Sequence, residues 1–329
     1  MRDFARRSAK DRRDLFTATS QLMHVHEAII EKDFWVCWVP DYLFHESPWK
    51  DKLIFKGGTS LSKAYRAIER FSEDIDLILD WKLLGYAADE PWEDRSSTQQ
   101  DIFGKEANSR TAEYLMQTFA PAMATDLKNR LGTEIEIWTE DQSVIIGYPR
   151  AFSLESIRPR IILEIGPLAE SVPNEQRDIC PFAAEKFPRL LTRGNTLVKT
   201  VVAERTFWEK ATILHQEAHR GDDKPLPARY SRHYYDLYRL SRLPIKTSAL
   251  NEIGLLNQVV RFKMKFYRCP WAKFEEARPG SLILQPALYH ITELRKDYDS
   301  MKSMLFGAVP AFNEIINGLK NLEIEINTL

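Results

Sequence analysis

Two aspartates separated by one apolar residue, Asp74 and Asp76, are the first residues whose spacing suggests chemistry. They begin an alternating stretch that ends at Leu79, a pattern that predicts a β-strand. Side chains alternate between the two faces of a strand, so both carboxylates are expected on one face, about 6.6 Å apart. Two carboxylates at that separation can share a hard cation such as Mg²⁺, whose remaining ligands are often substrate phosphates.

A Gly57-Gly58 pair precedes the aspartates, between an expected strand at 53–55 and an expected helix at 61–71 capped by Ser60. Glycine lacks a Cβ, so the chain can turn tightly here, and the amides of the helix start can bind an anion. An acidic strand and a Gly-Gly turn are each common by themselves, but strand, turn, helix and acidic strand in this order predict a phosphoryl-transfer site. The hydroxyls expected to face outward as further donors belong to Thr59, Ser60 and Ser62.

The segments KGGTSLSKAY and FSEDIDLIL resemble the AbiEii/AbiGii toxin family, a branch of the polymerase-β-like nucleotidyltransferase superfamily related to the MenT toxins. The spacer at 59–73 is longer than in the general superfamily signature and similar to that of this branch. The likeness extends over most of the chain and is weakest after about residue 250. It implies an α+β fold, with a small mixed sheet flanked by helices and a helical C-terminal half.

The resemblance also implies an activity. The enzyme would transfer a nucleoside monophosphate from an NTP to an acceptor hydroxyl, with Mg²⁺ or Mn²⁺ as cofactor. It would act as the toxin of a bacterial toxin–antitoxin or abortive-infection system. Its implied partners are the NTP, an RNA acceptor such as a tRNA 3′ end, and an antitoxin encoded by an adjacent gene. The nucleotide-binding residues implied are Lys56, Gly57, Gly58, Thr59, Ser60, Ser72, Lys210 and Arg232.

Glu164 is the candidate for a third carboxylate, which in the superfamily comes from a neighbouring strand, joins the metal site and takes the proton of the attacking hydroxyl. It is the one acid on the apolar strand RIILEIG. A charge there is costly unless it is solvated or paired, although an exposed strand end explains it as well. Glu134 and Glu136 alternate like a solvent-facing strand and are weaker candidates.

Two residues of the C-terminal half complete the candidate catalytic set. Lys210 lies in AERTFWEKATIL, where the resemblance implies a lysine that binds the triphosphate; a solvated lysine paired with a nearby glutamate is the alternative. Asp236 follows Arg232 by four residues in RYSRHYYDLYRL. It could orient Lys210 or an arginine, contact the nucleotide, or form an ordinary ion pair along one helix face.

Other suggestive residues carry less weight. His215 and His219 have the spacing of a metal-binding pair, but HQEAH has glutamine where the metalloprotease motif has its general base. The aromatic run of Phe34, Trp35 and Trp38 is typical of a hydrophobic core. Three widely separated cysteines indicate free thiols.

Bulk properties indicate a globular protein, because 44% of the 329 residues are hydrophobic and 28% are charged. No apolar run approaches the roughly 20 residues of a membrane span, and no secretory signal is evident, so a cytoplasmic location is expected. The stretch 69–101 is acidic, whereas 229–246 and 261–278 mix cations with aromatics, as in a polyanion-binding surface or ordinary solvated helices.

Two alternatives to nucleotide transfer onto RNA stay open. The acceptor could be a small-molecule or protein hydroxyl, or the chain could be a non-catalytic NTP-binding module.

The expected element order is an N-terminal helical lead, a mixed α/β core and a helical half, divided into domains 1–196 and 197–329. The lead is expected to be helical over 12–44 with a break near Pro40, and residues 167–195 to form a connection with at most a short helix. The remaining expected strands are 134–139, 143–148, 160–165 and 197–202, and the expected helices are 99–131, 203–218, 232–239, 250–266, 286–305 and 310–319.

Overall fold

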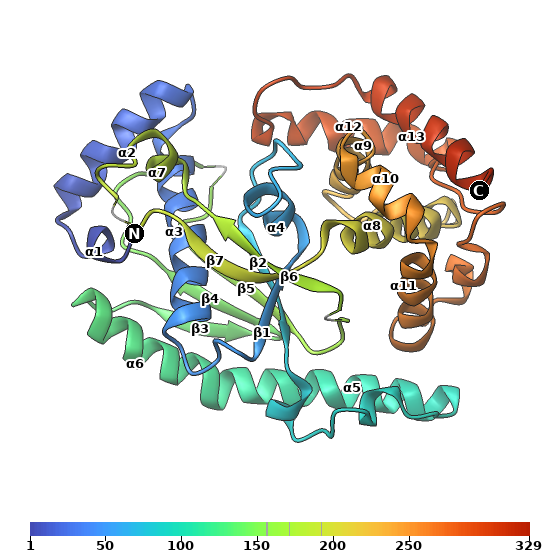
Figure 1. The fold of residues 1–329 in the computed structure, drawn as a ribbon, viewed down its shortest axis with the longest axis horizontal. Coiled ribbons are helices and arrows are strands. Elements are labelled where there is room, and N and C mark those ends of the chain that lie inside the picture. The colour runs from blue at the N-terminus through green and yellow to red at the C-terminus, as the bar shows by residue number, and fades with distance from the viewer. Residues whose placement is uncertain (156, 171, 192) are drawn as a thin grey trace. The chain divides into compact units, whose positions relative to one another are not determined.

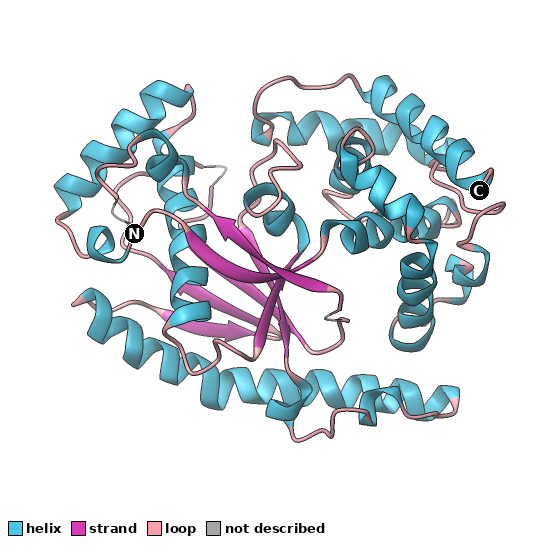
Figure 2. Ribbon diagram, viewed as in Figure 1, coloured by secondary structure: helices cyan, strands magenta, loops and turns pink. Residues whose placement is uncertain are grey.

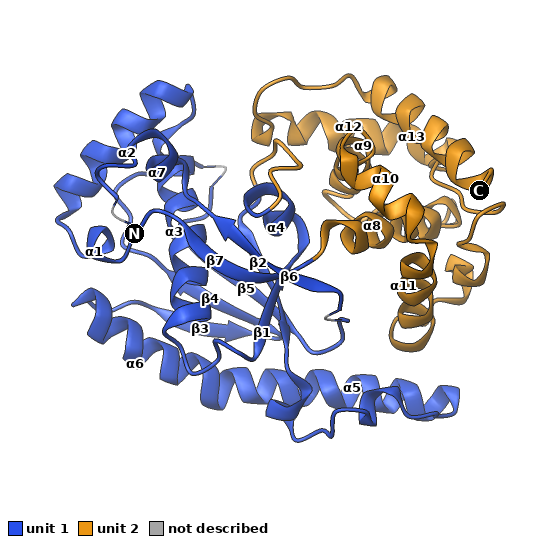
Figure 3. Ribbon diagram, viewed as in Figure 1, with its two compact units in different colours: residues 1–64, 72–201 blue, residues 65–71, 202–329 orange. Residues whose placement is uncertain are grey.

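A computed structural model describes residues 1–155, 157–170, 172–191 and 193–329. The chain forms two compact units (Figure 3). Unit 1 comprises residues 1–64 and 72–201, and unit 2 comprises residues 65–71 and 202–329. The sequence-based boundary lay at residue 196 rather than 201, and it did not include the excursion of residues 65–71 into unit 2.

Unit 1 is built on a seven-stranded mixed sheet with the strand order β3-β4-β5-β2-β1-β7-β6 (Figures 1 and 2). The strand that begins with Asp74, β2, pairs antiparallel with β1 and parallel with β5. A mixed sheet with helices confirms the expected α+β class. The strands are β1 (Leu53–Lys56), β2 (Asp74–Leu79), β3 (Ile137–Glu140), β4 (Ser143–Gly147), β5 (Arg160–Gly166), β6 (Asn174–Ile179) and β7 (Thr196–Val201).

The two faces of the central strands differ in polarity. On one face Phe55, Leu77 and Ile165 lie side by side in register, and all three are buried. The opposite face is apolar at Ile78 but carries charged residues on either side of Asp76. The period of two in the sequence therefore produces a fully apolar face and a face that becomes charged at one end of the sheet.

The helices of unit 1 include one, α3, that packs against β7 and β5 and is buried over almost its whole length. Pro40 lies inside this helix, so the expected break near Pro40 is wrong. Pro40 removes one backbone hydrogen bond, but burial of Val36, Trp38 and Tyr42 keeps the helix continuous. The helices are α1 (Arg2–Ala5), α2 (Ala9–Met23), α3 (Glu27–His45), α4 (Gly57–Lys63), α5 (Ser97–Tyr114), α6 (Ala120–Leu131) and α7 (Phe182–Lys186), with a π-helical turn at Leu115–Phe119 joining α5 to α6.

Two further expectations in unit 1 are wrong. The helix after the glycine pair begins at Gly57 and ends at Lys63, rather than running from 61 to 71. The connection at 167–195 contains the edge strand β6, which the sequence did not predict because it is short and charged and has a single buried residue, Ile179. Its backbone nevertheless pairs with β7 along its whole length.

Unit 2 is helical apart from one isolated bridge in its described residues. Its helix α8 has the predicted bounds, 203–218, because Phe207, Ala211 and Leu214 recur at the helical period and are all buried. None of the helices described in either unit is long and apolar enough to span a bilayer. The helices of unit 2 are α8 (Ala203–Ala218), α9 (Ser231–Leu240), α10 (Pro244–Asn251), α11 (Ile253–Phe266), α12 (Ile291–Met301) and α13 (Phe312–Asn327).

The segment 65–71 is held in unit 2 by backbone and side-chain bonds. The amide of Phe71 donates to the carbonyl of Met304 at 2.7 Å, and the amide of Glu69 donates to Oη of Tyr235 at 3.2 Å. These bonds replace the helical hydrogen bonds that the sequence pattern suggested. The packing also buries the side chain of Arg70.

Candidate active site

The predicted carboxylate pair lies on β2, and Asp74 and Asp76 are half-buried whereas Ile75 and Leu77 are fully buried. This alternation confirms that the two aspartates share a face of the strand. Asp76 is paired in register with Lys56 of β1 on one side and with Glu164 of β5 on the other. Side chains of directly paired residues lie on one face, and neighbouring strands lie about 4.7–4.9 Å apart.

Lys56, Asp76 and Glu164 therefore form a row across three strands, here called the carboxylate row. Glu164 is exposed although its neighbours Leu163 and Ile165 are buried, so its charge is solvated. Solvation removes the cost that a carboxylate on an apolar strand would otherwise carry. The register places the predicted third carboxylate beside the predicted pair.

The glycine turn lies directly against the carboxylate row. Gly57 has a φ of +78°, a conformation that favours glycine, and a Cβ built on it would lie 2.6 Å from Cγ of Asp76 and closer still to its Oδ2. The Asp76 carboxylate thus occupies the space that any other residue at 57 would fill. The turn therefore lies directly against the acidic strand.

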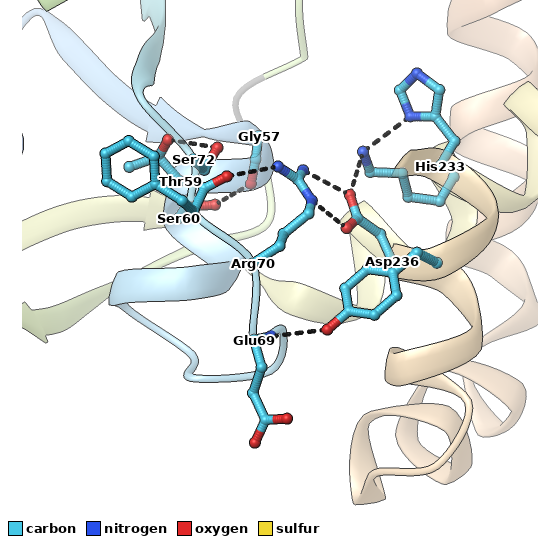
Figure 4. Close-up of polar contacts among 11 residues, drawn as sticks. Gly57, Thr59, Ser60, Glu69, Arg70, Ser72, His233 and Asp236 are labelled. Carbon is cyan, nitrogen blue, oxygen red and sulfur yellow. Dashed lines mark hydrogen bonds and ion pairs between the residues drawn. The ribbon is translucent and has the colours of Figure 1, made fainter. Parts of the chain in front are cut away.

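The hydroxyl groups next to the turn are used inside the protein. Oγ1 of Thr59 lies 2.9 Å from Oγ of Ser72 and bonds the carbonyl of Asp74, while Oγ of Ser60 donates to the carbonyl of Gly57 at 2.9 Å (Figure 4). Thr59 and Ser60 are buried, so the expectation that their hydroxyls face outward is wrong. Thr59 instead fastens the start of α4 to the start of β2.

The donor set fits a hard cation. Asp74 and Asp76 offer carboxylate oxygens on one face, the ligands that Mg²⁺ prefers, and the absence of a Cβ at Gly57 is what lets the Asp76 carboxylate take its position. Among the described residues, no three His, Cys, Asp or Glu side chains are gathered closely enough to hold a metal by themselves. In general, Mg²⁺ is bound by one or two protein carboxylates, and substrate phosphates and waters complete its shell.

A run of three buried charges on α3, formed by Glu31, Lys32 and Asp33, supports the acidic strand from within the protein. Lys32 is 1% exposed, and its ammonium donates to Glu73 at 2.5 Å and to the carbonyl of Arg158 at 2.9 Å. Burial lowers the pKa of Lys32, an effect that the carboxylate of Glu73 opposes. The lysine thus ties α3 to the residue immediately before Asp74.

The neighbouring Asp33 anchors the helix that follows the glycine turn. Its carboxylate forms an ion pair with Lys63 at the end of α4 and accepts the amide of Phe182 at 2.7 Å. The Lys63 ammonium also lies 3.6 Å from the centre of the Phe182 ring. Consecutive residues of α3 therefore hold both parts of the site in unit 1, α4 and the start of β2.

Unit 2 contains a second group of candidate residues, centred on Asp236, which is 0% exposed. Its two carboxylate oxygens accept from Nε and Nη2 of Arg70 at 2.7 and 2.9 Å, and Nζ of Lys210 lies 2.9 Å from Oδ2 (Figure 4). Burial alone would raise the pKa of Asp236, but the charges and hydrogen bonds of Arg70 and Lys210 hold it well below its ordinary value.

Lys210 has a further contact with His233, whose Nδ1 lies 3.0 Å from Nζ. We call Arg70, Lys210, His233 and Asp236 the buried charge cluster. Burial lowers the pKa of Lys210, and Asp236 partly restores it. Of the roles left open for Asp236, orienting both Lys210 and an arginine is the one that the geometry supports.

The i,i+4 ion pair between Arg232 and Asp236 is not formed, because Asp236 is occupied by Arg70 and Lys210. Arg232 is half-buried, and its charge contributes to lowering the pKa of Lys210 and His233. It therefore belongs near the cluster without being part of its bonded network.

His215 has a structural role. Its Nδ1 accepts the amide of Ile283 at 3.1 Å, and its Nε2 lies 3.0 Å from the carbonyl of Lys273. Both ring nitrogens are thus engaged with backbone groups, which agrees with the dismissal of a zinc site. Trp35 and Trp38 are likewise buried and stack edge to face at 5.4 Å, as core residues do.

Sequence reasoning missed Arg70 and His233. Arg70 lies 166 residues from its partner Asp236, so no local pattern could connect the two. The sequence did contain a signal for His233. It precedes Asp236 by three residues, so a helix there would place both side chains on one face.

Comparisons with known proteins bear on the family and the fold of the chain. A protein-family model described as "Nucleotidyl transferase AbiEii toxin, Type IV TA system" matches residues 41–318. The solved structure of MenT4, a nucleotidyltransferase toxin from Mycobacterium tuberculosis H37Rv, superposes with a TM-score of 0.51 at 15% sequence identity, over 95% of this chain and 90% of that one. That likeness shows the fold. No curated protein matches the sequence.

Proposed function

Because the chain belongs to the AbiEii family of nucleotidyltransferase toxins of type IV toxin–antitoxin systems, we propose that it transfers a nucleoside monophosphate from an NTP to an acceptor hydroxyl at the carboxylate row. The observation that carries this proposal is the position of Asp76, which lies against Gly57 and in register with Glu164. A glycine turn, a carboxylate pair and a third carboxylate thus meet at one end of a single sheet face.

In this proposal Asp74 and Asp76 hold Mg²⁺ or Mn²⁺, which when bound would offset the negative charge on the phosphate oxygens. Glu164 also borders this metal site and takes the proton from the acceptor hydroxyl. A bond then forms between the acceptor oxygen and the α-phosphorus, the bond from the α-phosphorus to the bridging oxygen breaks, and pyrophosphate leaves. Exposure of Glu164 supports this role, because it lets the carboxylate meet the acceptor and return the proton to water.

The nucleotide-binding assignments are part of the same proposal. Gly57, Gly58 and Lys56 are half-buried and are assigned to the phosphates, together with Lys210. Arg232 is the additional cation near Lys210. Thr59, Ser60 and Ser72 are assigned an indirect part, because the bonds of Thr59 and Ser60 shape the turn. Asp236 acts through Lys210 and Arg70 rather than on the nucleotide, since it is fully buried.

For the acceptor we propose an RNA, with a tRNA 3′ end as the specific candidate. On and after α11, the exposed cations Arg261 and Arg268 flank an exposed aromatic, Tyr267. Cations of this kind neutralise RNA phosphates, and an exposed ring offers a surface on which a base can stack. We place the reaction in the cytoplasm, under the control of an antitoxin encoded beside this gene.

The test is transfer of label from each of the four NTPs, labelled at the α-phosphate, by the purified full-length chain with Mg²⁺ and total cellular RNA. The proposal expects label in the tRNA-sized fraction, and none with Asp74→Asn or after chelation of the metal. Label that enters only small molecules or protein would contradict the RNA acceptor. NTP binding without pyrophosphate release in any of these mixtures would contradict catalysis and support a binding module.

A further inference from the structure

The contact between Lys210 and His233 is unusual because it places a cationic side chain against an imidazole inside the protein. The two residues come from different helices of unit 2, α8 and α9, and are only 7% and 8% exposed. Their nitrogens are 3.0 Å apart, a full hydrogen bond. Such proximity fixes the protonation state of the histidine.

A lysine ammonium has three donors and no acceptor, so Nδ1 of His233 must accept the bond and the ring proton must be on Nε2. The imidazole is therefore neutral. The ring of Tyr230 packs edge to face on it, with centroids 4.9 Å apart and planes at 83°, which holds the imidazole in the orientation that directs Nδ1 towards Lys210.

The charges around His233 favour the same state. Burial is the largest effect that lowers its pKa, followed by the positive charges of Lys210 and Arg232 and a smaller contribution from Arg70, while Asp236 acts in the opposite sense. The net result is a pKa well below the ordinary value for histidine. His233 consequently stays an acceptor at neutral pH.

Two of the three N–H groups of the Lys210 ammonium are thus bonded to side chains of unit 2. In the part of the chain that the structure describes, Nζ has Asp236 and His233 as its partners, which leaves one N–H for a ligand. With two of its donors fixed, the ammonium cannot rotate freely, and the third donor has a defined direction. An ammonium held only by Asp236 would lack this constraint.

We propose that His233 is a positioning residue for the nucleotide: as a neutral acceptor it orients Lys210 so that the remaining N–H meets a phosphate oxygen of the NTP. This inference rests on the proposed function, since it takes Lys210 as the lysine that binds the triphosphate. His233 does not touch the substrate itself. Its effect is expected in NTP affinity, with little effect on the step that follows binding.

The experiment compares three variants of the full-length chain that differ in where they place an acceptor. His233→Asn puts an amide oxygen near the position of Nδ1, His233→Gln puts it near Nε2, and His233→Leu removes it. Binding of a non-hydrolysable NTP analogue with Mg²⁺ is measured by calorimetry, and KM and kcat for NTP are measured with acceptor RNA in excess.

We expect the glutamine and leucine variants to weaken NTP binding and raise KM by about tenfold or more, the usual effect of losing one charge-assisted hydrogen bond. The kcat should change by less than about threefold, and asparagine should restore most of the affinity. In a Lys210→Met background, adding His233→Gln should cost nothing further, because the histidine acts through the lysine.

Acidification provides a second readout. NTP affinity should fall at low pH more steeply for the wild type than for His233→Asn, because only the wild type loses its acceptor on protonation; the shared titration of the phosphate cancels in this comparison. Equal affinity of the wild type and the glutamine variant, with equal melting temperatures, would overturn the role of His233 while leaving the proposed function intact. Failure of the wild type to bind any NTP would overturn both.

Discussion

Gly57 lies so close to Asp76 that a single added carbon would collide with the carboxylate. The φ of +78° at Gly57 adds a second constraint, because L-residues rarely adopt it. The turn and the acidic strand are thus mutually dependent: the strand can present Asp76 only where residue 57 has no side chain.

Replacement of Gly57 by alanine is therefore expected to abolish nucleotide transfer and to destabilise unit 1 by about 1–3 kcal/mol through backbone strain. Turnover and urea unfolding measure the two effects. Gly104→Ala is the matched control, since this glycine lies in α5 with nothing within 4 Å of an added Cβ. That control should retain activity and be as stable as the wild type or slightly more stable. An active Gly57→Ala enzyme would contradict the assigned role of the turn.

Glu164→Gln tests the third carboxylate. If Glu164 takes the proton of the acceptor hydroxyl, kcat should fall by about 10²–10⁴-fold. Stability should hardly change, because the side chain is exposed. The comparison variant is Glu175→Gln on the edge strand β6, another acid of the same sheet outside the carboxylate row. A kcat for Glu164→Gln within twofold of the wild type would remove Glu164 from the mechanism.

Lys32→Met tests the support beneath the acidic strand. The change leaves Glu73 without its ammonium partner in a mostly buried position, which is expected to cost about 3–5 kcal/mol of unfolding free energy. The double variant Lys32→Met, Glu73→Gln should recover part of this loss, because it removes the mostly buried carboxylate charge together with the ammonium. Lys52→Met, which breaks a partly exposed ion pair with Asp80 in the same unit, should cost no more than about 1 kcal/mol. Equal costs for the two lysine variants would mean that burial of Lys32 has no energetic consequence.

Asp236→Asn is expected to destabilise unit 2 by about 3–5 kcal/mol, since Arg70 and Lys210 would keep buried positive charges with a neutral partner. Arg70→Lys should also destabilise, because lysine cannot make the bidentate contact. Denaturant unfolding of both is compared with Glu325→Gln, which breaks the exposed pair with Lys246 and should cost below about 1 kcal/mol. If Asp236→Asn unfolded at the same denaturant concentration as the wild type, the buried charge cluster would contribute nothing to stability.

Stability should decrease on mild acidification. Burial lowers the folded-state pKa of both His215 and His233 below the ordinary 6.5. Between the lowered and the ordinary pKa the unfolded chain binds more protons, so the stabilisation is complete above about pH 6.5 and is lost as the pH falls through the folded values. The slope reaches at most about 1.4 kcal/mol per pH unit for each histidine. Unfolding curves at pH 7.5, 6.5 and 5.5 measure it, and a smaller slope is expected for His233→Asn. A free energy of unfolding that stays constant across this range would contradict the neutral state of His215 and His233 in the folded protein.

Asp74, Asp76 and the glycine pair show what local sequence could predict. Alternation over six residues fixes the face on which the two carboxylates lie, and a turn without side chains fixes where the chain can reverse. The bounds of α8 followed equally directly from the spacing of its buried residues. Each of these features depends on residues that are close in the sequence, so the periodicity of the sequence is enough to predict it.

Local sequence predicted the bounds of helices less well where tertiary contacts override the local helix propensity. Proline breaks most helices, yet α3 continues through Pro40 because the residues on both sides of it are buried. The predicted helix after the glycine pair stops at Lys63, because residues 65–71 instead bond to the segment around Met304. Propensity is a weak preference that tertiary contacts of several kilocalories overcome.

The sequence alone thus determined the local features: an acidic pair on one strand face, a glycine turn before it, and an α+β class. Tertiary structure alone decided which distant groups lie together within each unit, by pairing Glu164 with Asp76 in unit 1 and by enclosing Asp236 between Arg70 and Lys210 in unit 2. The physical reason is that strand register and the pairing of buried charges depend on the free energy of the whole packed unit. No short stretch of residues contains that information.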